Sequence, residues 1–220
     1  MKLTTKLLAA GALLAAAQAN AVVIDFTSAP WDSAGGLTSY TDGIVTVTAG
    51  PAGEKLYYDA IDGLGVDGLK EPDEIDLTEF IEISFTSDVW VEKIFITDFF
   101  NRANEPAGDG SDPVRGEVAY ISFWLDGVEL IAPNSPQTIY GDNSEQINGE
   151  QTLSYAPLAI VFDTVKFSTA GINDDLSVKG LEYFIVPETQ TNVPEPSIAV
   201  LLGLGLMGLG LSRRRQAKKA

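Results

Sequence analysis

Apolar and polar residues in the middle of the chain alternate with a period of two. In the segment Ile81–Phe85, isoleucine and phenylalanine at every second position are separated by Glu82 and Ser84, which is the pattern of a strand with one buried face. The segment Ile44–Thr48 consists of β-branched residues, which favour strands. Two apolar segments, Glu117–Leu125 and Val128–Ile131, flank Asp-Gly at 126–127, and this arrangement predicts a hairpin.

Further short segments have the same strand-like character and are separated by Gly, Pro, Asp and Asn. They are Val22–Phe26, Lys55–Asp59, Val89–Thr97, Gln137–Tyr140, Thr152–Tyr155, Ile160–Ser168 and Ser177–Val186. No long amphipathic helix is indicated, and Pro72–Phe80 would give one helical turn at most. We therefore predict an all-β domain at residues 22–186, an antiparallel β-sandwich with a jelly-roll-like order of strands.

The N-terminus has the pattern of a secretory signal peptide at residues 1–21. Lys2 and Lys6 precede the apolar segment Leu7–Ala17, and small residues at Ala19 and Ala21 offer a cleavage site. A short apolar helix between a basic start and such a site is typical of export signals. We expect export through the secretion translocon, with cleavage by signal peptidase after Ala21.

The C-terminus has a second targeting pattern. A polar, Pro-bearing linker at residues 187–197 is followed by an apolar run at 198–211 and a basic tail at 212–220. As a helix the apolar run would be about 21 Å long, which is short of the hydrocarbon thickness of about 30 Å. We expect a short transmembrane helix that holds the precursor transiently in the inner membrane, with the basic tail in the cytoplasm. A plain tail anchor is the alternative.

The order of residues in this tail resembles a known sorting signal. Val193-Pro194-Glu195-Pro196-Ser197, the apolar run, and Arg213, Arg214 and Arg215 are similar to the PEP-CTERM signal. The resemblance extends weakly into the domain, at Asp62–Gly68 as a turn, at the acidic stretch and strand that follow, and at Asp174–Leu181 as a final strand. It implies processing by an exosortase, and delivery to the cell surface or to a matrix of extracellular polysaccharide.

Charge and composition exclude several classes of function. The chain has 31 acidic and 14 basic residues. The segment 22–196 contains all 31 acidic residues and only seven of the basic ones, which gives it a net charge of −24. Such a domain repels nucleic acid. The chain contains no cysteine and no histidine, which excludes disulfides, thiolate metal sites and Ser-His-Asp or Cys-His catalysis.

Acidic loops and aromatic residues supply the candidate binding sites. Carboxylates in flexible loops are ligands for calcium, and our first candidates for such a site are Asp62, Asp67, Asp98, Asp109 and Asp112. The same loops would equally act as solvated surface, and both interpretations stay open. Aromatic rings can stack on sugars, and the candidates for this role are Trp31, Tyr57 and Tyr58, for which packing in the core or on a strand is the alternative. We expect Trp90 and Trp124, which lie within strands, to be core residues.

The sequence favours a non-enzymatic protein of the bacterial envelope that binds glycan or matrix, with calcium as the one cofactor to consider. A carbohydrate-active hydrolase is the first alternative, because paired carboxylates at the right separation perform glycoside hydrolysis. No flanking sequence distinguishes any one pair. A passive, tail-anchored surface protein without a ligand is the second alternative.

Overall fold

The chain forms an antiparallel β fold. The structure, a computed structural model, describes residues 21–68, 73–100, 116–130, 137–141, 149–155, 160–170 and 174–187. These residues contain one 3₁₀ helix at Trp31–Ala34 and twelve strands. The strands are β1 (Val22–Asp25), β2 (Ser39–Asp42), β3 (Val45–Gly50), β4 (Leu56–Asp59), β5 (Gly63–Val66), β6 (Phe80–Thr97), β7 (Val118–Leu125), β8 (Val128–Glu129), β9 (Gln137–Tyr140), β10 (Gln151–Ser154), β11 (Val161–Thr169) and β12 (Ser177–Ile185).

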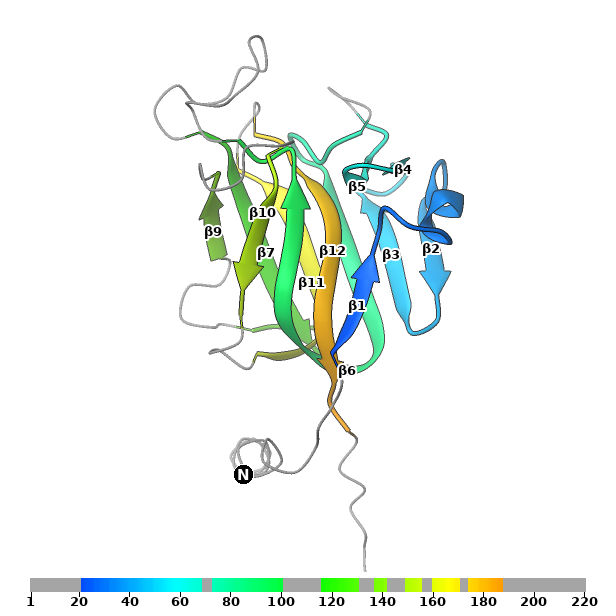
Figure 1. Cartoon of the computed structure of the whole chain (residues 1–220), viewed down its shortest axis with the longest axis vertical. Coiled ribbons are helices and arrows are strands. Elements are labelled where there is room, and N and C mark those ends of the chain that lie inside the picture. Colours follow the sequence, from blue (N-terminus) through cyan, green and yellow to red (C-terminus); the bar gives the residue numbers. More distant parts are fainter. Residues whose placement is uncertain are drawn as a thin grey trace, which may run out of the picture. The chain divides into compact units, whose positions relative to one another are not determined.

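The long strand β6 joins two layers (Figure 1). Its first half pairs with β3 and β11, and β11 continues to β7 and then to β8 and β9. Its second half pairs with β12 and β10, and β12 continues to β1 and β5. We call these the β11 layer and the β12 layer. All of these pairs are antiparallel, which confirms the predicted all-β class; the jelly-roll order of strands stays a prediction.

The two layers enclose one core of apolar side chains. Along the first part of β6, buried residues such as Ile81 and Ile83 alternate with half-buried residues. This follows because successive side chains of a strand point to opposite faces. Phe85 of the β11 layer meets Tyr183 of the β12 layer with ring centroids 5.0 Å apart. Phe123 of β7 meets Tyr155, which follows β10, at 5.4 Å. These ring contacts fix the layers face to face.

Three local expectations differ from the structure. The predicted strands at 81–85 and 89–97 are one continuous strand, β6. The segment Gly63–Val66, expected as a turn, is strand β5, where Gly65 passes so close to Asp73 that a Cβ atom would lie 1.8 Å from its carbonyl oxygen. Residues 73–79 contain no helical turn; Leu77 has a φ of 50°.

The terminal segments that carry targeting patterns fall outside the described residues. These include the predicted signal peptide at residues 1–21, except for Ala21, and the predicted transmembrane helix at 198–211. Among the described residues, no helix is long and apolar enough to cross a membrane. The chain divides into two compact units, Met1–Val186 and Pro187–Ala220.

Candidate functional site

Carboxylates from four separate segments converge where β6 ends and β12 begins. We call this group, Asp62, Asp73, Asp98 and Asp175, the acidic cluster. Asp98 directly follows β6 and has a φ of 55°, in the left-handed region. Asp62 precedes β5 and Asp175 precedes β12. The cluster thus depends on the fold, because its members are up to 113 positions apart in the sequence.

The environment of Asp98 disfavours its charged form. Burial of the carboxyl is the largest cause, and the nearby carboxylates of Asp62, Asp73 and Asp175 add to it. A hydrogen bond from the Ser177 side chain acts in the opposite direction. Together these effects raise the pKa of Asp98 to about 8. A buried carboxyl among like charges holds its proton near neutral pH, which is the arrangement expected for a general acid or for a site that receives a cation.

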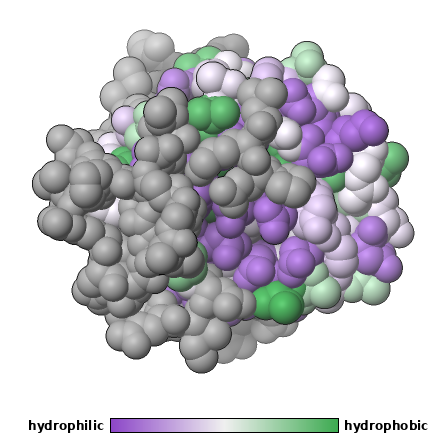
Figure 2. Space-filling model, turned by 90° about the horizontal axis from the view of Figure 1, so that it is seen from above, coloured by the Kyte–Doolittle hydropathy of each residue, from purple (hydrophilic) through white to green (hydrophobic). Residues whose placement is uncertain are grey.

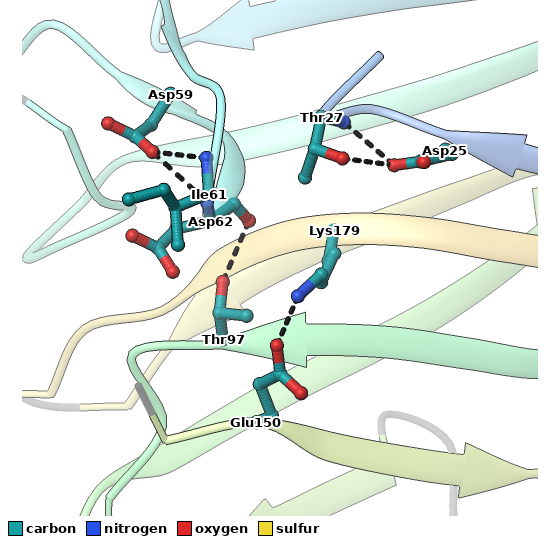
Figure 3. A network of polar contacts seen from close by, with 8 residues as sticks. All are labelled: Asp25, Thr27, Asp59, Ile61, Asp62, Thr97, Glu150 and Lys179. Carbon is teal, nitrogen blue, oxygen red and sulfur yellow. Dashed lines mark hydrogen bonds and ion pairs between the residues drawn. The ribbon is translucent and has the colours of Figure 1, made fainter. Parts of the chain in front are cut away.

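Hydrogen bonds fix the loop that carries Asp62 (Figure 3). One carboxylate oxygen of Asp59 accepts bonds from the backbone amides of Ile61 at 2.6 Å and Asp62 at 3.1 Å. Short polar side chains stabilise turns in this way. The Thr97 hydroxyl then donates to the Asp62 carbonyl oxygen at 2.7 Å. This bond links the β4–β5 turn to the end of β6, and so places Asp62 beside Asp98.

More carboxylates lie buried in the chain segments next to the acidic cluster. Asp76, Glu79, Glu117 and Asp174 are each at least nine-tenths buried. Two of these carboxylates accept hydrogen bonds from the backbone. The amide of Asp76 donates to the Glu79 carboxylate at 3.2 Å, and the amide of Phe100 donates to the Glu117 carboxylate. Seen from the end of the fold where β6 finishes, hydrophilic residues gather near the centre of the view, and only scattered hydrophobic residues accompany them (Figure 2).

The structure brings together part of the predicted calcium set. Asp62 and Asp98 act on each other electrostatically, whereas Asp67 is exposed and its amide bonds to the Lys55 carbonyl at 2.7 Å. Asp109 and Asp112 lie outside the described residues. Within the described ranges, no three acidic side chains are placed so as to hold a metal ion. Calcium therefore stays a proposal, and any such site needs oxygen ligands in addition to Asp62 and Asp98.

The three aromatic candidates differ in burial. Trp31 is only 3% exposed and packs against Phe26 at 4.7 Å, so its ring is a core residue and cannot stack on a sugar. Tyr58 is half-buried and its hydroxyl donates to the Thr27 carbonyl at 2.7 Å. Tyr57, on β4, is also half-buried.

Trp90 and Trp124, which we expected in the core, lie half-buried on outward faces of the two layers. Strand alternation explains this, because their neighbours Val89, Val91 and Phe123 take the inward positions. Sequence reasoning also missed Asp73 and Asp175 as partners of Asp98. Their convergence follows from the pairing of β12 with β6, for which the sequence carries no local signal.

Comparison with protein families finds a match at the C-terminus, where the description "PEP-CTERM protein-sorting motif" fits residues 192–215. The chain carries a PEP-CTERM sorting motif. The matched range contains the predicted sorting residues from Val193 to Ser197 and from Arg213 to Arg215, all outside the described residues. The predicted resemblance is thereby confirmed. No curated protein matches the chain.

Solved structures similar to the PEP-CTERM chain share little sequence with it. Discoidin II of Dictyostelium discoideum is 13% identical, with a TM-score of 0.35 over 82% of this chain and 60% of its own. A rhamnosidase from Klebsiella oxytoca with rhamnose bound is 15% identical, with a TM-score of 0.33 over 68% and 32%. The CBM32 of AlyQ, in complex with 4,5-unsaturated mannuronic acid, is 19% identical, with a TM-score of 0.33 over 68% and 98%. With TM-scores this low, these structures carry no argument about the site.

Proposed function

We propose that the chain is an exported protein of the bacterial envelope whose β domain binds glycan or matrix without catalysing a reaction. The observation that carries this proposal is the PEP-CTERM motif at residues 192–215, which follows a compact unit that ends at Val186 and whose described residues are predominantly β. A sorting motif specifies delivery, and the domain in front of it is the part delivered. The absence of histidine and cysteine from the chain supports a binding role over nucleophilic catalysis.

The proposed route has three steps. The signal peptide at residues 1–21 takes the chain to the translocon and is removed by signal peptidase. The apolar run at 198–211 then tethers the precursor in the inner membrane, and an exosortase cuts near Pro194-Glu195-Pro196. The released domain reaches the cell surface or the extracellular matrix. Intact mass of the protein recovered from cells tests this route: a mature protein that still contains Arg213–Arg215 would contradict it.

The glycan role is tested by co-sedimentation of the full-length chain, in mild detergent, with the extracellular polysaccharide of the bacterium that makes it. We expect the protein to sediment with the polysaccharide and to stay in solution without it. Absence of binding would refute the glycan role and leave a surface protein without this ligand.

Calcium at the acidic cluster is a further part of this proposal. Binding of a divalent cation would offset the repulsion between Asp62 and Asp98, in a domain segment that carries a net charge of −24. We expect calcium to raise the melting temperature above its value in EDTA, and magnesium at the same concentration to do so less. Equal melting temperatures in calcium and EDTA would remove calcium from the proposal.

The raised pKa of Asp98 beside Asp62 favours one second candidate, a carbohydrate-active hydrolase. Glycosidases use two carboxyl groups, one of which holds its proton until the leaving group takes it. Against this, two surface hollows of the described residues are lined by residues outside the acidic cluster: one lies between β1, β6, β10 and β12, the other between β9 and β10. Release of reducing ends from the polysaccharide, abolished by both Asp98→Asn and Asp62→Asn, would establish the hydrolase.

A further inference from the structure

The outward face of the β11 layer carries hydroxyl side chains in register across five strands. The strands are β2, β3, the first half of β6, β11 and β7, with β9 beside β7. Directly paired residues place their side chains on the same face, so the register defines three parallel rows. The first row is Thr41, Thr46, Ser84, Thr164 and Trp124; the second is Ser39, Thr48, Glu82, Lys166 and Ser122; the third is Gly50, Phe80, Ser168, Tyr120 and Thr138.

We call these three rows the hydroxyl face. The positions between them on the same strands, such as Val47, Ile83 and Val165, are fully buried in the core, whereas the members of the rows, apart from Gly50, are half-buried or exposed. The rows therefore belong to the surface of the layer. With strands about 4.8 Å apart, each row is about 19 Å long. That is room for several sugar units of an extended chain.

Hydrogen bonds between neighbouring strands order the hydroxyl groups. Thr41 and Thr46 lie 2.9 Å apart through their hydroxyl oxygens, and Ser39 and Thr48 lie 3.0 Å apart. The Thr164 hydroxyl donates to the Ser84 hydroxyl at 3.4 Å, which continues the first row towards β7. Hydroxyls held in this way present fixed donors and acceptors, so these side chains lose less conformational entropy when a partner binds.

Aromatic rings stand at the β7 side of the hydroxyl face. The indole nitrogen of Trp124 donates to the Ser122 hydroxyl at 3.2 Å, which holds the indole against the face. Tyr120 lies in the third row, two positions before Ser122 on the same strand. Such rings offer apolar surface for the C–H groups of a sugar. The Phe80 ring is already occupied, because the Lys166 ammonium lies 3.5 Å from its centroid.

The three rows of the hydroxyl face carry no net charge in a strongly acidic domain. Their charged members are Glu82 and Lys166, one of each sign, paired directly across β6 and β11, while Glu129 of β8 pairs with Trp124 at the end of the first row. The segment 22–196 as a whole carries a net charge of −24. An anionic polymer would be repelled by such a domain, and a cationic partner would be drawn to its acidic parts instead. The partner suited to this face is uncharged and rich in hydroxyl groups.

We propose that the hydroxyl face is the glycan-binding surface and that its ligand is an uncharged polysaccharide. This inference rests on the proposed function and makes it more specific, since it names both the surface and the ligand class. The ordered hydroxyl groups exchange hydrogen bonds with sugar hydroxyls, and Trp124 stacks on a sugar ring at the end of the first row.

The test is affinity electrophoresis of the full-length chain in mild detergent, in gels that contain hydroxyethyl cellulose, laminarin or dextran. Carboxymethyl cellulose serves as the anionic counterpart of the first probe. Two variants remove the proposed contacts. Thr41→Val with Thr46→Val replaces both partners of one hydrogen bond by side chains of the same shape, a change that is nearly neutral for stability. Trp124→Ala removes the stacking ring.

Matched controls lie on the outward face of the β12 layer. Thr152→Val with Ser154→Ala changes two exposed hydroxyls of β10, and Trp90→Ala removes a half-buried tryptophan that packs on Phe184. Melting temperatures of all four variants establish that each is folded. We expect both face variants to weaken binding to at least one neutral probe tenfold or more, and both controls to bind within twofold of the wild type.

The other outcomes separate the surface from the function. Wild-type binding to a neutral glycan that both face variants retain would overturn the hydroxyl face and leave the glycan role intact. Preference for carboxymethyl cellulose would overturn the uncharged ligand and likewise leave the glycan role. Absence of binding to all of the probes would overturn this inference, and the sedimentation with native polysaccharide then decides the proposed function separately.

Discussion

The environment of Asp98 makes a prediction that can be worked out in detail, for the substitution Asp98→Asn. Asparagine has nearly the same shape as aspartate, and it accepts the left-handed backbone at this position, where φ is 55°. Its side-chain oxygen can keep the hydrogen bond from Ser177, while the charge is lost. The variant therefore isolates the cost of ionising a buried carboxyl beside Asp62 and Asp73.

The expected size and sign follow from the pKa of Asp98, which is raised from 3.8 to about 8 in the folded protein. Below pH 4 the carboxyl is protonated in both states, so it contributes no difference. Between pH 4 and 8 the unfolded chain loses the proton and the folded chain keeps it, so the free energy of unfolding falls as the pH rises. Above pH 8 the loss is constant, at most about 6 kcal/mol for a shift of this size.

The assay is urea unfolding in EDTA at pH 4.5 and at pH 9, followed by tryptophan fluorescence. We expect Asp98→Asn to exceed the free energy of unfolding of the wild type by about 1 kcal/mol at pH 4.5, and by a further ~1 kcal/mol or more at pH 9. Asp126→Asn is the control, because Asp126 also has a left-handed φ, 54°, but is exposed. A gain for Asp98→Asn that is the same at both pH values, or equal to that of the control, would refute the reasoning.

Three further substitutions are measured by the same unfolding assay. Ile83→Ala opens a cavity at a fully buried position of β6 and should lower the free energy of unfolding by about 2–5 kcal/mol; a loss below 1 kcal/mol would contradict the proposed core. Gly65→Ala places a Cβ atom 1.8 Å from the Asp73 carbonyl oxygen and should cost about 3 kcal/mol. Gly35→Ala is the control, because its φ is −55° and its Cβ atom would lie in ordinary contact, 3.6 Å from Tyr58. Tyr155→Phe removes a buried hydroxyl that has no hydrogen-bond partner among the described residues and should raise the free energy of unfolding by about 1 kcal/mol; destabilisation would show that the hydroxyl is bonded after all.

The strands could be predicted from the sequence because their signal is local. Alternation along Ile81–Phe85 and the Asp-Gly turn after Leu125 each predict an element from a few neighbouring residues, and the structure contains both. Strand β2, Ser39–Asp42, was missed because its residues are polar and exposed at the edge of the β11 layer. Strand β5 was missed because its glycines suggest a turn, whereas the structure uses Gly65 for close approach to Asp73.

The candidate sites could be predicted only in part because they depend on which strands pair. Asp62 and Asp98 are candidates because their segments are rich in carboxylates, but the electrostatic effect of Asp175 on Asp98 requires β12 to lie beside β6. The burial of Trp31 likewise depends on how the segments pack, because its ring contacts Phe26 and Tyr40, from two different segments. The hydroxyl face has no sequence signature at all, because Thr41, Thr46 and Thr164 come to lie in one row only through the register of the paired strands.

Strand direction separates the two candidate surfaces from each other. The strand β12 starts at Ser177, beside the acidic cluster, and ends at Ile185, one residue before the first compact unit finishes at Val186. The acidic cluster therefore lies at the end of the domain away from the point where the chain leaves for the sorting motif. The hydroxyl face runs along the side of the β11 layer between these two ends. A neutral polymer could lie across that face without approaching the buried carboxylates, so cation binding at one surface and glycan binding at the other need not compete.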